Sequence, residues 1–144
     1  MITISRRYKF SASHRLHSPT FSEAENVDVF GKCNNPFGHG HNYEIEVSVR
    51  GEIDGPSGRL VDLARLDDLV NRTVIRRYDH RYLNEELPEF ETAIPTTENL
   101  GREVDRLLGS AWPAAFPSGR PTLERIRIFE TERNMIDVEH QTRA

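Results

Sequence analysis

The sequence opens with MITISRRYKFSASH, residues 1–14, in which apolar and polar side chains alternate. A second alternating stretch, HNYEIEVSVRGEI, covers residues 41–53. Because successive side chains of a strand point to opposite faces of a sheet, each stretch predicts a β-strand with one buried face. The buried faces are expected to contain Ile2, Ile4, Tyr8, Phe10 and Ala12 in the first strand and Tyr43, Ile45, Val47 and Val49 in the second.

Two helices and a C-terminal hairpin are predicted after these strands. Leucine and valine recur with a helical period over residues 62–78. A second helix is expected to begin near Thr96 or Thr97, since threonine can cap a helix N-terminus. Apolar alternation on both sides of residues 131–134 predicts the hairpin.

The predicted order of strand, strand, helix, helix, strand and strand indicates an α+β fold. In that fold two helices cover one face of an antiparallel sheet. Residues 17–40 are rich in glycine, proline and asparagine, and residues 113–121 are rich in proline and glycine. Both stretches are expected to form loops. No repeat or linker divides the chain, so residues 1–144 are interpreted as one domain.

Composition narrows the classes of function. Hydrophobic residues make up 36% of the 144 positions, so contact with further copies of the chain would add apolar burial. The net charge of −4 gives no general attraction to nucleic acid, and no apolar run approaches the roughly 20 residues of a membrane span. A start without a signal-peptide core and a single cysteine, Cys33, favour a cytoplasmic location.

Three histidines lie on the predicted apolar faces. His14 ends the first strand pattern, and His39 and His41 immediately precede or begin the second. On an extended chain, His39 and His41 point the same way with Cα atoms about 7 Å apart, so both can reach one ion. Three imidazoles form a zinc site with one open coordination position. His17 and His140 follow no such pattern and are expected at the surface.

Cys33 lies in a polar loop, between Lys32 and Asn34, six positions before His39. A thiol beside a metal can act as an acid or base, or it can close the site as a fourth ligand. The spacing fits both roles, and a buried cysteine without function is the third possibility.

Four further residues are candidates for a polar site. Asp79 and His80 follow the first predicted helix, where they are either a dipole-compensating end or a proton relay to Cys33. Glu98 lies in the first turn of the second helix, a common position for a carboxylate. Glu130 continues an apolar strand face, where a carboxylate can hold an N–C–N edge through two parallel hydrogen bonds.

At these residues the chain resembles the 6-pyruvoyl-tetrahydropterin synthase family. The resemblance covers Phe10 to about Val138 and is specific because six motifs combine. They are FSASHRLHS (10–18), FGKCNNPFGHGHNY (30–43), GEID (51–54), DH (79–80), TTEN (96–99) and ETERN (130–134).

The resemblance implies a T-fold, with a four-stranded antiparallel sheet and two helices on one face. Family members assemble as trimers around a twelve-stranded β-barrel, and two trimers stack into a homohexamer with active sites between subunits. It further implies that His14, His39 and His41 bind zinc and that Cys33 is the general base, assisted by Asp79 and His80. Glu130 would anchor a pterin, helped by Thr97 and Glu98.

The implied reaction converts 7,8-dihydroneopterin triphosphate to 6-pyruvoyl-tetrahydropterin, as in tetrahydrobiopterin biosynthesis. Arg15, Lys9 and Lys32 are further candidates for meeting the triphosphate. A sister branch makes 6-carboxy-tetrahydropterin for queuosine; Pro95 resembles that branch, whereas the five residues between Cys33 and His39 resemble the biopterin branch. A third, folate-related branch has glutamate in place of the cysteine. A non-catalytic pterin- or zinc-binding module is the alternative of another class.

Overall fold

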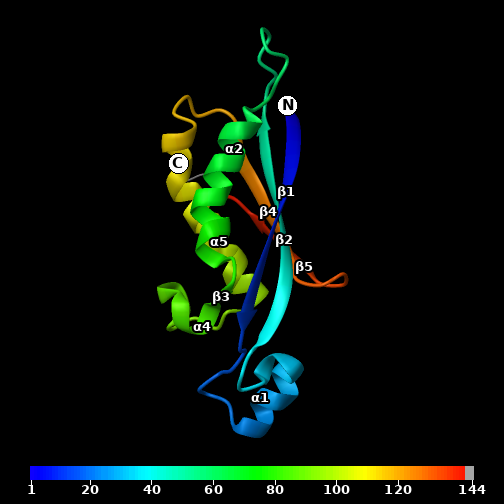
Figure 1. Cartoon of the computed structure of the whole chain (residues 1–144). Helices are drawn as coiled ribbons and strands as arrows, with labels where there is room; N and C mark the ends of the chain where they lie inside the picture. Colours follow the sequence, from blue (N-terminus) through cyan, green and yellow to red (C-terminus); the bar gives the residue numbers. More distant parts are fainter. Residues whose placement is uncertain (142–144) are drawn as a thin grey trace.

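A computed structural model describes residues 1–141, and its centre is a sheet with helices on one face (Figure 1). The strand order is β3-β1-β2-β4-β5, and the sheet of a single chain is open. Four strands pair antiparallel as predicted: β1 (Ile2–His14), β2 (His39–Gly51), β4 (Thr122–Phe129) and β5 (Met135–Glu139).

The expectation of four strands was incomplete, because a fifth strand borders β1. This strand, β3 (Arg81–Tyr82), has only two residues and pairs in parallel with Ala12 and Ser13. So short a strand carries no alternating pattern, and only its neighbours in space define it. The second strand also begins and ends two residues earlier than predicted.

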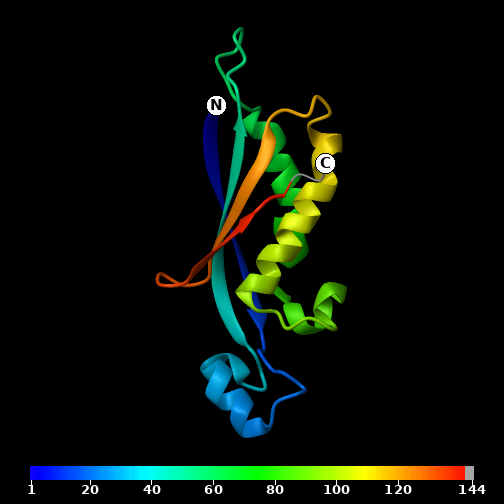
Figure 2. The ribbon, with the colours of Figure 1, turned by 180° about the vertical axis from the view of Figure 1, so that it is seen from behind.

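Two helical segments cover one face of the sheet (Figures 1 and 2). The first is the predicted segment 62–78, with Asp62 as its N-cap. It consists of α2 (Leu63–Val70), a π-helical part η2 (Asn71–Ile75) and α3 (Arg76–Tyr78). The second is α5 (Thr97–Ala115), capped by Thr96 through a hydrogen bond from the Asn99 N–H.

The core lies between these helices and the sheet. Its buried side chains come from β1, β2 and β4 on one side and from α2, η2 and α5 on the other, including Phe10, Ile45, Val47, Leu66, Leu69, Leu100, Leu108 and Ile126. α5 continues through Pro113, so the predicted loop at 113–121 begins later than expected. Because Pro113 lies near the C-terminal end of the helix, only the last turn is affected.

The predicted loop at 17–40 contains a helix, α1 (Glu23–Phe30), followed by a 3-10 turn, η1 (Gly31–Asn34). A capping box starts α1: the Ser22 hydroxyl accepts from the Glu25 N–H, and the Glu25 carboxylate accepts from the Ser22 N–H. The buried Asn26 side chain ties α1 to the preceding loop. It donates to the carbonyls of Ser18 and Ser22 and accepts from the Ser18 N–H at 2.7 Å.

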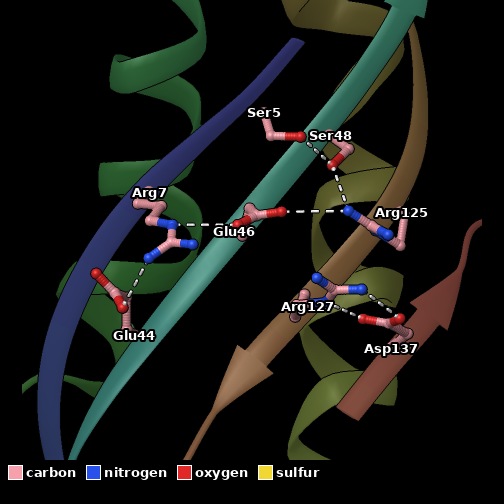
Figure 3. A network of polar contacts seen from close by, with 8 residues as sticks. All are labelled: Ser5, Arg7, Glu44, Glu46, Ser48, Arg125, Arg127 and Asp137. Atoms are coloured by element: carbon pink, nitrogen blue, oxygen red, sulfur yellow. Dashed lines mark hydrogen bonds and ion pairs between the residues drawn. The ribbon is translucent and has the colours of Figure 1, made fainter. Parts of the chain in front are cut away.

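The helix-free face of the sheet is polar and internally paired (Figure 3). Glu46 is 7% exposed on this face because it lies between Arg7, at 3.1 Å, and Arg125, at 3.2 Å. Arg127 forms a two-pronged contact with Asp137 on the neighbouring strand. Opposite charges that face each other on neighbouring strands stabilise the sheet, so this face can be rich in charged residues.

Two short elements, α4 (Leu83–Glu86) and η3 (Pro88–Phe90), connect β3 with α5. Among the helices of residues 1–141, none has the length and apolar character that crossing a membrane requires.

Replacing Asn26 with alanine tests the anchoring of α1. We expect Asn26→Ala to lower the free energy of unfolding by roughly 2 kcal/mol, because it leaves a buried N–H without an acceptor. Asn71→Ala, at an exposed helical position, is the matched control and should change it by less than about 0.5 kcal/mol. Chemical denaturation measures both, and equal effects would contradict the anchoring role.

Candidate functional site

The pairing of β1 with β2 gathers the predicted histidines at one end of the sheet. His14 pairs with His39, and Ala12 pairs with His41. Paired residues share a face of the sheet, so all three imidazoles lie on the helix side. The ring centroid of His41 is 4.8 Å from that of His14 and 4.7 Å from that of His39.

A thiol joins two of these imidazoles. The Nε2 atoms of His14 and His41 are 3.1 Å apart, and Cys33 Sγ is 3.9 Å from His41 Nε2. One possible ligand atom from each of these three residues lies within 4.8 Å of the other two. His39, expected as the third ligand, contacts this group through its ring but does not belong to it. The structure thus places Cys33 close enough to His14 and His41 to share a metal ion with them. This is the fourth-ligand role that the sequence left open.

His14 is held in an orientation suited to a metal. Its Nδ1 lies 2.9 Å from the Pro95 carbonyl and 3.2 Å from the Tyr43 hydroxyl, which leaves Nε2 facing His41. Burial lowers the pKa of His14 to about 4, and the charge that His41 can carry adds to the decrease. Burial also lowers the pKa of His41, and the charge that His39 can carry acts in the same direction. Both rings are therefore neutral at pH 7, the form that binds a metal.

The donor set fits a zinc ion. Two nitrogens at about 2.0–2.1 Å from a tetrahedral zinc are roughly 3.3 Å apart, close to the separation of the His14 and His41 Nε2 atoms. Burial and the nearby Glu130 raise the pKa of the Cys33 thiol, so without a cation it stays protonated. A positive ion in this group would reverse that effect and favour the thiolate.

Glu130 borders the same group from the end of β4. Its Oε1 is 4.0 Å from His41 Nε2, and the Thr97 hydroxyl donates to its Oε2. Burial raises the pKa of Glu130, and repulsion from Glu98 adds to the increase. Thr97 and Glu98 are the first residues of α5, so the N-terminus of that helix lies beside the Glu130 carboxylate.

Asp79 and His80 lie on the outer side of β1. His80 Nδ1 is 3.0 Å from Asp79 Oδ2, and the Asp79 carboxylate also accepts from the Ser11 N–H. The His80 side chain is 83% exposed, and within the chain its partner is Asp79, whereas the polar neighbour of Cys33 is His41. The pairing of Asp79 with His80 is present; one chain does not bring His80 to Cys33.

His80 also has an unusual backbone. Its φ of 59° is the only positive value at a non-glycine position in residues 1–141. Its N–H donates to the Ser11 carbonyl at 2.6 Å, which fixes this turn against β1. A left-handed residue with a Cβ atom costs roughly 1–2 kcal/mol, and such strain gathers at functional positions.

Sequence reasoning missed several supporting residues. Tyr43 and Pro95 orient His14. Tyr43 follows His41 by two residues, so strand alternation places it on the same face as the histidines and could have indicated this role. No sequence signal marks Pro95 as a hydrogen-bond acceptor. His17 and His140 are not simple surface residues: His17 contacts the Asn34 amide, and His140 Nδ1 lies 2.8 Å from Asp105.

Neutral imidazoles, a thiol and a half-buried carboxylate at one end of an α+β sheet form a candidate metal-dependent enzyme site. The sequence profile described as "6-pyruvoyl tetrahydropterin synthase" matches residues 3–141. The chain therefore belongs to the 6-pyruvoyl tetrahydropterin synthase family.

Individual relatives agree with this membership. A Poecilia reticulata protein named 6-pyruvoyl tetrahydrobiopterin synthase is 42% identical, over 92% of this chain and 86% of the relative. The structure of Caenorhabditis elegans 6-pyruvoyl tetrahydropterin synthase superposes with a TM-score of 0.84 at 38% identity, covering 97% of this chain and 96% of that one. A Rickettsia conorii protein named 6-carboxy-5,6,7,8-tetrahydropterin synthase is 24% identical, over 96% of this chain and all of the relative.

Replacing His80 with asparagine tests whether the His80 imidazole contributes to the stability of the fold. Asparagine tolerates the left-handed conformation, so we expect His80→Asn to leave the free energy of unfolding unchanged or to raise it by up to about 1 kcal/mol. A loss of stability by thermal or chemical denaturation would show that the exposed imidazole is structural.

Proposed function

We propose that this protein is a zinc-dependent lyase that converts 7,8-dihydroneopterin triphosphate to 6-pyruvoyl-tetrahydropterin and releases triphosphate. The observation that carries the proposal is the group of His14, Cys33 and His41 beside Glu130 in a member of this family. The names of the more similar relatives support the same reaction.

Glu130 is the proposed anchor of the pterin ring. A carboxylate matches the N–C–N edge of a pterin through two parallel hydrogen bonds, which fixes both position and orientation. Thr97 holds the carboxylate, and Glu98 is a second acceptor at the same helix end. Glu130 Oε1 is 4.0 Å from His41 Nε2, so a ring anchored there would lie next to the imidazoles.

His14, His39 and His41 are the proposed zinc ligands. His14 and His41 belong to the group described above, and the family resemblance supports His39, whose ring centroid is 4.7 Å from that of His41. Bound zinc would polarise the side-chain hydroxyl groups of the substrate and acidify the neighbouring C–H. Cys33, as thiolate, takes that proton, the electron pair of the broken C–H bond moves into a new double bond, and triphosphate departs. Proton transfers, aided by the Asp79–His80 pair, then shift the double bond to give the product.

A second copy of the chain is the proposed source of His80. In one chain His80 is exposed, and within residues 1–141 most of the outer edge of β1 and that of β5 have no neighbouring strand. Edge pairing of four long strands from each of three copies would give a twelve-stranded barrel and remove these edges. We propose a homohexamer of two such trimers, with sites between subunits.

Turnover of the substrate tests the reaction itself. We expect the zinc-loaded protein to release triphosphate from 7,8-dihydroneopterin triphosphate and to form the 6-pyruvoyl product, identified by mass spectrometry. A 6-carboxy product would instead assign the chain to the sister activity for which the Rickettsia conorii relative is named. If no triphosphate appears, the lyase proposal is wrong and a binding module is the better interpretation.

Cys33→Ala distinguishes a catalytic thiol from a metal ligand. If Cys33 is the base, the variant should keep its zinc content and its fold, and its rate should fall by at least about 100-fold. As a structural ligand, its loss would release zinc and lower the melting temperature. Zinc per chain, measured after dialysis, decides between the two, with His14→Ala as the control that loses metal under either assignment.

Mixing two inactive variants tests the shared site. Cys33→Ala and His80→Asn should each be inactive, whereas subunits unfolded together and reassembled should recover roughly a quarter of wild-type activity. That fraction follows because one site in four receives both native side chains. Mixtures as inactive as the separate variants would place Cys33 and His80 of one chain in the same site.

A further inference from the structure

An unassigned cavity adjoins the proposed metal centre. Its walls include residues of α1 and η1, which lie at the end of the sheet where β2 begins (Figure 1). Its volume is about 740 Å³, within the usual range of small-molecule sites. His39 lies on its wall, so the cavity adjoins the histidine group. Arg15, His17 and Lys32 also line it, opposed by one carboxylate, that of Glu23.

The basic side chains of this cavity, Arg15 and Lys32, have no carboxylate partner among residues 1–141. Some arginines elsewhere in the chain are held by carboxylates, as in the pairs of Arg77 with Glu89 and Arg127 with Asp137. In the described residues, Arg15 and Lys32 take part in no ion pair. The Arg15 Nε–H donates to the Asn34 carbonyl at 3.2 Å, which leaves its terminal amino groups available for an anion.

The backbone around Arg15 is fixed, so its side chain starts from a defined position. The Asn84 amide bonds both the N–H and the carbonyl of Arg15, at 2.7 and 2.8 Å. The next residue, Leu16, donates its N–H to the Cys33 carbonyl at 2.7 Å. These bonds join the end of β1 to the segment that carries Lys32 and Cys33.

His17 adds a donor of defined tautomer. The Asn34 amide nitrogen donates to the Leu16 carbonyl and lies 3.2 Å from His17 Nδ1. Because that amide nitrogen can only donate, Nδ1 accepts and the ring proton is on Nε2. A neutral His17 can therefore still donate a hydrogen bond to an anion in the cavity.

We propose that this cavity is a polyphosphate subsite in which Arg15, Lys32 and His17 hold the triphosphate of the substrate. The assignment rests on the proposed function and follows from the order of the parts. Glu130 lies beside His41, the histidines come next, and the cavity follows beyond His39. A pterin ring, a hydroxylated side chain and a terminal triphosphate have the same order. Lys9 has no place in the subsite, since it pairs with Glu44 in the β-ladder and lies on the helix-free face.

Binding of inorganic tripolyphosphate tests the subsite without turnover. By calorimetry on the zinc-loaded protein, we expect Arg15→Gln to weaken tripolyphosphate binding roughly ten- to hundredfold, the effect of losing charge-assisted hydrogen bonds. Lys32→Gln should weaken it in the same direction; its side chain is exposed, so this variant guards against misfolding at Arg15. Both variants should bind phosphate-free neopterin as the wild type does.

Arg59→Gln is the matched control. Arg59 is exposed in the loop that follows β2, at the other end of a 13-residue strand and roughly 40 Å from His39. The Arg59→Gln protein should bind tripolyphosphate with wild-type affinity. Any chelation of zinc by tripolyphosphate affects this variant and Arg15→Gln equally. If Arg15→Gln and Arg59→Gln bind alike, or the wild type does not bind, the subsite is wrong. Arg15-dependent binding in a protein without lyase turnover would support the subsite while rejecting the proposed reaction.

Discussion

The pairing register of β1 with β2 is the constraint on which the rest of this structure depends. Thirteen consecutive pairs run from Ile2 opposite Gly51 to His14 opposite His39 without a bulge. A shift by one residue would turn every side chain of one strand to the other face, so His14 would leave the helix side. The apolar ladder around Phe10, Tyr43 and Ile45 fixes this register, and the same register sets the position of the histidines.

The middle and one end of this ladder have different environments. The middle is apolar and is covered by α2 and α5. The end where β2 begins has buried imidazoles, which are destabilising if left without partners. The chain supplies those partners through the Pro95 carbonyl, the Tyr43 hydroxyl and the imidazoles themselves. Charges on the opposite face of the sheet are paired among themselves, so that network is separate from the site.

Much of this arrangement follows from sequence pattern. Alternation gave β1, β2 and the hairpin, and threonine capping located the start of α5, because these signals are local. The glycine, proline and asparagine residues of 17–40 predict a loop and hide α1, although Ser22 and Glu25 form a capping box at its start. β3, the π-helical turn and the approach of Cys33 to His41 depend on tertiary contacts that no local pattern contains.

X-ray absorption spectroscopy of the zinc-loaded protein tests the account most directly, because sulfur and nitrogen ligands lie at different distances, about 2.3 and 2.0–2.1 Å. The account predicts a shell of three imidazole nitrogens and one exchangeable light atom, with no sulfur. A sulfur scatterer in place of His39 would contradict it, because Cys33 would then close the site that the substrate is proposed to enter.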